Sequence, residues 1–113
     1  MNLTVNVQEN NHEYLIKIKG EIDVYTAPKL KKQLLPLIEK EGVKIQIDLL
    51  DTTYLDSTGL GVFISAFKTT QQNNSEIEII HVNDRVHRLF TVTGLDKIIK
   101  LKEFKMSRGN ESE

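Results

Sequence analysis

The sequence predicts a single α/β domain with a mixed sheet of about five strands and helices mainly on one face. The chain has 113 residues, which is room for one domain. Apolar residues alternate with polar ones in several short segments and recur at helical spacing in others. Three of the expected strands keep a polar face, whereas a sheet covered on both faces would have nearly continuous apolar strands.

The expected strands are short segments in which every second residue is apolar. A polar turn at 9–11 joins the first two, which predicts an antiparallel hairpin. The later strands are separated by helices, so we expect them to run mainly parallel through right-handed connections. The predicted strands are 3–8, 14–19, 43–49, 76–79 and 98–102, the last being the weakest pattern.

The first helix is predicted over residues 27–40. Thr26 is placed as its N-cap, Pro28 lies in the first turn, and Gly42 follows its end. Pro36 lies inside the helix, where its ring and missing N–H are expected to distort the last turn.

Two further helices are predicted after the third strand. A loop over 50–56 leads into the second, whose apolar spacing fades at the polar run 71–74. The third helix is short, with Asp84 as its cap and Gly94 as its C-terminal stop.

Composition and charge limit the possible functions. The 15 basic and 16 acidic residues give a net charge of −1, so neither a nucleic acid nor a membrane is expected as a partner. There is no cysteine, which excludes thiol catalysis and suits a cytoplasmic protein. Residues 1–105 are expected to form the domain, and 106–113, which have no periodicity, are expected to fray.

The segment 56–61, Asp-Ser-Thr-Gly-Leu-Gly, is the most informative stretch of the sequence. It places the Ser57 hydroxyl at the start of a helix, where unpaired N–H groups and the helix dipole favour a negative group. The two glycines remove side chains nearby and would let another protein's active site approach. A simpler interpretation is that Ser57 only caps the helix.

The segment 20–28, Gly-Glu-Ile-Asp-Val-Tyr-Thr-Ala-Pro, places an acidic residue, an aromatic residue and a hydroxyl just before another helix. Both segments lead into helices at the same end of the predicted sheet, so we expect this loop to border Ser57. The simpler alternative is a turn and cap in which Tyr25 only packs against the domain.

Other functional motifs fail on this chain. A dinucleotide fingerprint needs Gly or Ala where Ile64 stands, and a nucleophile elbow needs Gly where Leu55 stands. No Gly-Lys-Ser or Gly-Lys-Thr phosphate loop is present. His12, His81 and His87 lack metal-ligand spacing, so neither a cofactor nor a metal is expected.

Taken together, segment 20–28 and segment 56–62, Asp-Ser-Thr-Gly-Leu-Gly-Val, resemble the anti-sigma factor antagonists built on the STAS domain, most closely those of the general-stress, sigma-B type. The resemblance covers about residues 3–102 in element order and implies the STAS-type sheet. It also implies partner switching, in which the unphosphorylated form binds an anti-sigma factor that is also a serine kinase, and stress-response transcription proceeds. Phosphorylation would end that binding, and a separate serine phosphatase of the PP2C type would reverse it.

The resemblance also assigns roles to individual residues. Ser57 takes the place of the phosphorylated serine, with Thr58 as a second candidate acceptor, and the chain would be a substrate rather than an enzyme. Two alternatives remain open, a small hydrolase with Ser57 as nucleophile and an unphosphorylated STAS subunit of a larger stress-sensing assembly. The implied partner-binding residues are Asp23, Val24, Tyr25, Thr26, Asp56, Thr58, Gly59 and Gly61.

Overall fold

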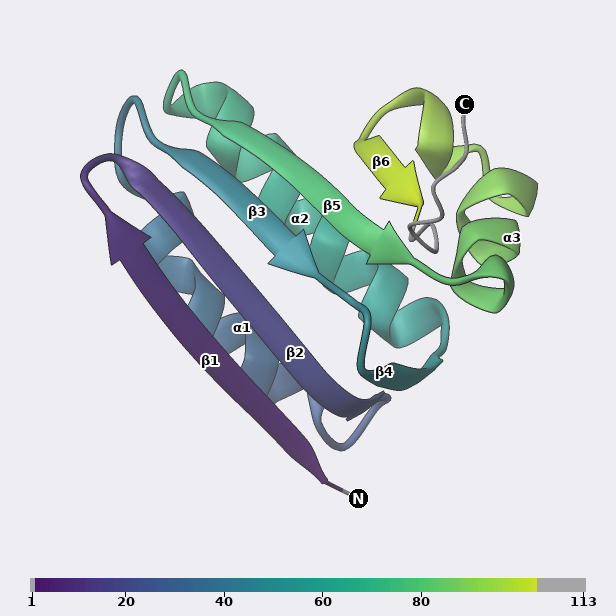
Figure 1. Ribbon diagram of the computed structural model, residues 1–113. Helices are drawn as coiled ribbons and strands as arrows, with labels where there is room; N and C mark the ends of the chain where they lie inside the picture. Colours follow the sequence, from purple (N-terminus) through teal and green to yellow (C-terminus); the bar gives the residue numbers. More distant parts are fainter. Residues whose placement is uncertain (1, 104–113) are drawn as a thin grey trace, which may run out of the picture.

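The structure, a computed structural model, describes residues 2–103 (Figure 1). The predicted tail 106–113 lies outside the described residues. In chain order the elements are β1 (Leu3–Asn10), β2 (Glu13–Ile22), α1 (Ala27–Ile38), β3 (Lys44–Asp48), β4 (Thr52–Leu55), α2 (Ser57–Gln72), β5 (Glu76–Val82), α3 (Asp84–Val92), the 3-10 helix η1 (Leu95–Lys97) and β6 (Lys100–Glu103).

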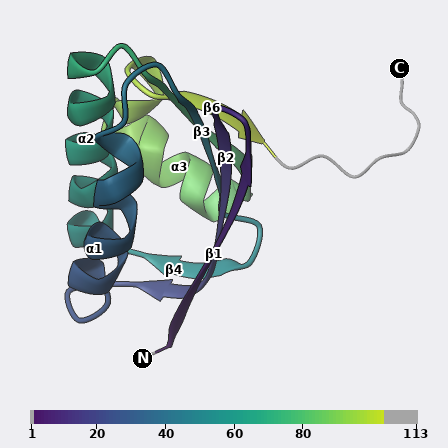
Figure 2. The same cartoon turned by 90° about the vertical axis from the view of Figure 1, so that its left-hand side faces the viewer.

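The predicted α/β architecture is confirmed. The strands form one mixed sheet in the order β1-β2-β3-β5-β6, with β4 paired to β2. Within residues 2–103, only β1 and β2 are antiparallel, and all other neighbouring strands run parallel. The described helices all lie on one side of this sheet (Figure 2). The polar alternation in the strands predicted this arrangement because one sheet face remains in contact with solvent.

The strand β4 was not predicted, since the sequence analysis assigned 50–56 to a loop. The reason lies in the length of β2, whose first five residues pair with β3, while Gly20–Ile22 extend past the end of β3. The free edge of this extension is taken by β4 (Figure 1). The buried Thr52 hydroxyl donates to the Ile18 carbonyl at 2.9 Å and fixes the start of β4. In the part of the chain that the structure describes, the sheet therefore has six strands instead of five.

Helix α1 ends earlier than predicted, at Ile38 rather than at residue 40. Pro36 lies two residues before this end and has no N–H to donate within the helix, while the Glu39 N–H still bonds to the Leu35 carbonyl at 3.2 Å. The Lys40 N–H then bonds to the Leu37 carbonyl at 3.1 Å, which is the tighter spacing of a 3-10 turn. Thr26 occupies the N-cap position but makes no side-chain capping bond, because its hydroxyl is used in the preceding loop.

The cap of α3 is Asn83, so the prediction of Asp84 as cap is wrong by one residue. The Asn83 side-chain oxygen accepts the Val86 N–H at 2.9 Å, and Asp84 is the first residue inside the helix. Gly94 lies just beyond the end of α3 with φ +79°, as predicted for a stop. The turn η1 follows it and delays the last strand, which runs over 100–103 rather than 98–102.

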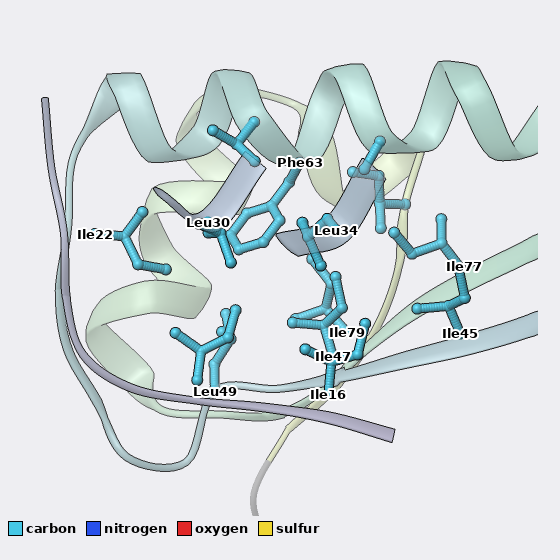
Figure 3. Packing of buried hydrophobic residues seen from close by; sticks show 14 of the residues in the cluster. Ile16, Ile22, Leu30, Leu34, Ile45, Ile47, Leu49, Phe63, Ile77 and Ile79 are labelled. Carbon is cyan, nitrogen blue, oxygen red and sulfur yellow. The ribbon is translucent and has the colours of Figure 1, made fainter. Parts of the chain in front are cut away.

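The core lies between the sheet and the helices (Figure 3). Isoleucines from the inner faces of β2, β3 and β5 meet leucines of α1 and Phe63 of α2, whose ring stacks near Phe90 of α3 at 6.2 Å between centroids. This packing fixes both helices against the sheet and so determines where they begin. The fully buried large side chains are Ile16, Ile18, Ile22, Leu30, Leu34, Ile45, Ile47, Leu49, Phe63, Ile79, Phe90 and Ile99.

The uncovered face of the sheet is held by polar contacts. Gln46 of β3 donates to Glu78 of β5 at 3.0 Å, and Lys102 of β6 lies 3.2 Å from the same carboxylate. Burial raises the pKa of Glu78, but Gln46 and the charges of Lys102 and Lys100 lower it more, so this pKa lies below its usual value. These contacts join three neighbouring strands without a covering helix.

Gly20 allows β1, β2 and β4 to meet, and its replacement is expected to destabilise the domain. Its φ is +113°, and an added Cβ would collide with the Asn2 carbonyl, whereas Gly42 has φ +69° and open space around it. We expect Gly42→Ala to cost about 1 kcal/mol of unfolding free energy and Gly20→Ala about 2–3 kcal/mol. Urea unfolding measures both, and equal costs for the two variants would contradict this role of Gly20.

Candidate functional site

The ends of β2 and β4 bring the two predicted segments together. Ile22 and Leu55 form the last pair between these parallel strands, and the Asp56 N–H donates to the Ile22 carbonyl at 3.3 Å. Beyond this pair, β2 continues through residues 23–26 into α1, and β4 continues through Asp56 into α2. The prediction that the two segments are neighbours is confirmed, and the unpredicted strand β4 is its cause.

Ser57 is the first residue of α2, and it is not the cap. Asp56 is the N-cap, and its carboxylate accepts the N–H groups of Thr58 at 3.0 Å and Gly59 at 3.1 Å. Ser57 is exposed, and within residues 2–103 its hydroxyl has no hydrogen-bond partner. The capping interpretation of Ser57 is therefore wrong, because the residue before it satisfies the end of the helix.

The two glycines of α2 have different surroundings. Gly59 is buried, and an added Cβ would collide with Leu55 and would come within 2.7 Å of Ile22. Its missing side chain lets the first turn of α2 lie against the ends of β2 and β4. Gly61 is exposed, and an added Cβ there would meet nothing within 4 Å. Packing inside the domain thus explains Gly59 but not Gly61.

The loop between β2 and α1 is held by Asp23 and Thr26, both of which are buried. The Asp23 carboxylate accepts the N–H groups of Tyr25 at 2.9 Å and Thr26 at 3.0 Å. The Thr26 hydroxyl donates to the Glu21 carbonyl at 2.7 Å and accepts the Asp23 N–H at 2.9 Å. Desolvation raises the pKa of Asp23, but the bonds that its carboxylate accepts from the Thr26 N–H, the Tyr25 N–H and the Thr26 hydroxyl lower it more, so this pKa lies below its usual value of 3.8.

The same loop presents two apolar side chains to solvent. Val24 is 58% exposed and Tyr25 is 76% exposed, although both lie between the buried Asp23 and Thr26. The sequence predicted all four residues, 23–26, as partner-binding residues. The structure separates them into two that hold the loop's shape and two that form its outer surface.

A groove runs between the N-terminal turns of α1 and α2, with a volume of about 470 Å³. It joins the two predicted segments through Val24 and Thr58, which both line it, and Gly61 opens its α2 side. Sequence analysis assigned no site role to the other lining residues, which are Ala27, Pro28, Lys31 and Val62.

Tyr54 is a further exposed residue near Ser57 that the sequence did not single out. It is 46% exposed and pairs with Glu21 on β2, three residues before Ser57. The run Thr52-Thr53-Tyr54 consists of residue types favoured in strands and was the available signal for β4. The sequence did not distinguish Lys31 as a groove residue, because the outer face of α1 carries several lysines.

Residues 2–103 contain no cluster of three or more histidine, aspartate or glutamate side chains suited to a metal. No helix in the same range is long and apolar enough to span a membrane.

Comparison with known proteins identifies the family. Residues 4–108 match the STAS domain model. The chain belongs to the STAS-domain family. This STAS domain is 46% identical over 103 residues to the anti-sigma-B factor antagonist of Listeria monocytogenes, with 90% of each chain covered. It thus belongs with the anti-sigma factor antagonists, as the two motifs predicted.

Solved structures show the same fold at lower identity. An anti-sigma factor antagonist from Mycobacterium paratuberculosis matches with a TM-score of 0.81 at 24% identity, covering 89% of this STAS domain and 86% of that chain. The Bacillus protein SpoIIAA matches in its unphosphorylated form with a TM-score of 0.74, at 15% identity and 87% coverage of both chains. Its phosphorylated form matches with a TM-score of 0.67, at 12% identity, covering 87% and 90%.

The lowered pKa of Asp23 predicts a pH-dependent contribution to stability. A carboxyl with a lower pKa in the folded state stabilises the fold above its unfolded pKa, and this contribution is lost as the pH falls through the folded pKa. Asp23→Asn keeps an oxygen acceptor but removes the charge. We expect the variant to be less stable than the parent at pH 7, and the difference to shrink below about pH 4. A difference that stays constant down to pH 2, measured by urea unfolding, would contradict this.

Proposed function

We propose that this STAS domain is an anti-sigma factor antagonist that acts by partner switching. Its unphosphorylated form binds an anti-sigma factor, which is also a serine kinase, and so releases a sigma factor of the general-stress type. Phosphorylation of Ser57 ends this binding. The observation that carries the proposal is the position of Ser57, exposed at the start of α2 and adjacent in the fold to the exposed Val24 and Tyr25.

Ser57 is suited to be the phosphate acceptor. Its hydroxyl points to no partner among the described residues, and Asp56 alone caps the helix, so modification breaks no bond of the fold. A phosphate at the first helical position also gains from the helix dipole. We therefore expect phosphorylation to leave the domain folded. Thr58 is exposed too and is the alternative acceptor.

The partner surface consists of the outer residues of the two segments. Val24, Tyr25, Thr58 and Gly61 are exposed and are proposed to contact the anti-sigma factor directly. Asp23 and Thr26 act beneath them, because their hydrogen bonds fix the loop in its binding shape. Asp56 and Gly59 similarly position the first turn of α2.

Charge explains how one phosphate can switch the partner. Phosphorylation adds about −1.5 to −2 charges at neutral pH, and so changes the net charge from −1 to about −3. Leaving such a group unpaired in an interface costs roughly 3–5 kcal/mol, which weakens binding roughly a hundredfold to a few thousandfold. The loss thus arises at the interface and not within the domain.

The remaining steps belong to other proteins. The kinase partner binds ATP, so this domain acts as a substrate and regulator without a cofactor of its own. A PP2C-type serine phosphatase restores the active form. The proposed setting is the cytoplasm, where the released sigma factor turns on transcription, and this domain itself contacts no nucleic acid. The name of the relative from Listeria monocytogenes supports an anti-sigma factor as the partner.

The proposal is tested with the anti-sigma factor encoded in the same genome, in the presence of ATP. We expect one phosphate on Ser57 by intact mass and peptide mapping, none on Ser57→Ala, and one on the control Thr58→Ala. The phosphorylated domain should bind the anti-sigma factor about a hundredfold more weakly, or worse, by calorimetry. Phosphate on Thr58, or equal affinities of the two forms, would contradict the proposal. No phosphate, together with large assemblies on sizing columns, would favour the STAS scaffold subunit.

A further inference from the structure

We infer that the groove between α1 and α2 receives an apolar side chain of the anti-sigma factor, and that Lys31 pairs with a carboxylate beside that side chain. The inference rests on the proposed function, because it takes the same protein as the partner. It adds the chemistry that the partner must present to this surface.

The groove is suited to an apolar side chain. Val24, Ala27 and Pro28 line one side of it, and Val62 lines the other. Val24 is largely exposed, so the edge of the groove is an apolar surface that a partner could cover. Its position beside the first turn of α2 makes it continuous with the surface that must enter the kinase active site at Ser57.

Gly61 provides the observation that the fold alone does not explain. Glycine is disfavoured inside a helix relative to alanine, and here it lies within α2 with no neighbour in the space of its missing Cβ. Gly59 differs because its missing side chain is needed for packing against Leu55 and Ile22. The absence of a side chain at position 61 keeps the groove open, so a partner side chain has room to enter it.

Lys31 provides the charge. It lines the groove from α1, is exposed, and within residues 2–103 has no carboxylate within 4 Å of its ammonium group. The nearby Lys29 is already used, since it donates to the Leu3 carbonyl at 2.7 Å, and Asp56 is used as a helix cap. An unpaired ammonium beside an apolar groove favours a carboxylate next to an apolar side chain.

This arrangement also explains why phosphorylation would weaken binding and not strengthen it. A phosphate on Ser57 would stand on the same helix end as the groove and would repel a partner carboxylate seated beside Lys31. The acidic character of the docking residue therefore makes the partner sensitive to phosphorylation.

The test compares matched variants for binding to the anti-sigma factor of the same genome. Lys31→Glu is paired with Lys32→Glu, which makes the same charge change on the next residue but does not line the groove. We expect Lys31→Glu to weaken binding roughly tenfold or more, and Lys32→Glu to change it by less than about threefold. Gly61→Leu should weaken binding at least about tenfold by filling the groove, with a thermal unfolding midpoint no lower than the parent's, because leucine is favoured over glycine inside a helix.

A second experiment exchanges the charges of the proposed ion pair. Restored binding in the doubly substituted pair would show a direct contact, which a general change in surface charge would not produce. Replacing surface carboxylates of the anti-sigma factor by lysine, one at a time, should yield one variant that binds Lys31→Glu better than it binds the parent. Equal effects of Lys31→Glu and Lys32→Glu, or normal binding by Gly61→Leu, would overturn the inference. If the parent domain still binds and is phosphorylated on Ser57 in that case, the proposed function stands. If the parent itself does not bind, both fail.

Discussion

The pairing of β4 with the end of β2 is the constraint on which the rest of the site depends. Gly20–Ile22 extend beyond β3, and β4 covers this extension before the chain turns into α2. The two helices then begin near each other (Figure 1), and Val24 of loop 23–26 and Thr58 of α2 line the same groove. Because both helices cover the same core, neither start can shift without disturbing buried isoleucines.

Two aspartates hold this surface in shape through hydrogen bonds with backbone N–H groups. Asp23 fixes a loop whose apolar side chains face outward, and Asp56 satisfies the N–H groups at the start of α2. Each has a carboxylate engaged with backbone, which leaves the neighbouring residue exposed: Val24 in one case and Ser57 in the other. The domain can therefore offer a hydroxyl and apolar groups to a partner without weakening its own hydrogen bonding.

Much of this could be predicted from the sequence, and the misses have physical causes. Alternation in the strands predicted the single-sided sheet, and the segments 20–28 and 56–62 led to the STAS family. Strand β4 was missed because its local signal is only the short run of strand-favouring residues 52–54, and its pairing depends on the length of β2, which is a long-range property. Ser57 was an equally plausible cap to Asp56 by residue type, and only the backbone geometry separates them. A role for Lys31 could not be predicted, because exposed helix faces commonly carry lysine.

The central claim is that phosphate on Ser57 changes the surface and leaves the fold intact. The most direct measurement is a comparison of amide-proton NMR spectra of the unphosphorylated and phosphorylated domain, residue by residue. The account predicts shift changes confined to loop 23–26 and the first turns of α1 and α2, with the amides of β2, β3 and β5 unchanged. Widespread changes through those central strands would contradict it, because they would mean that phosphorylation rearranges the domain itself.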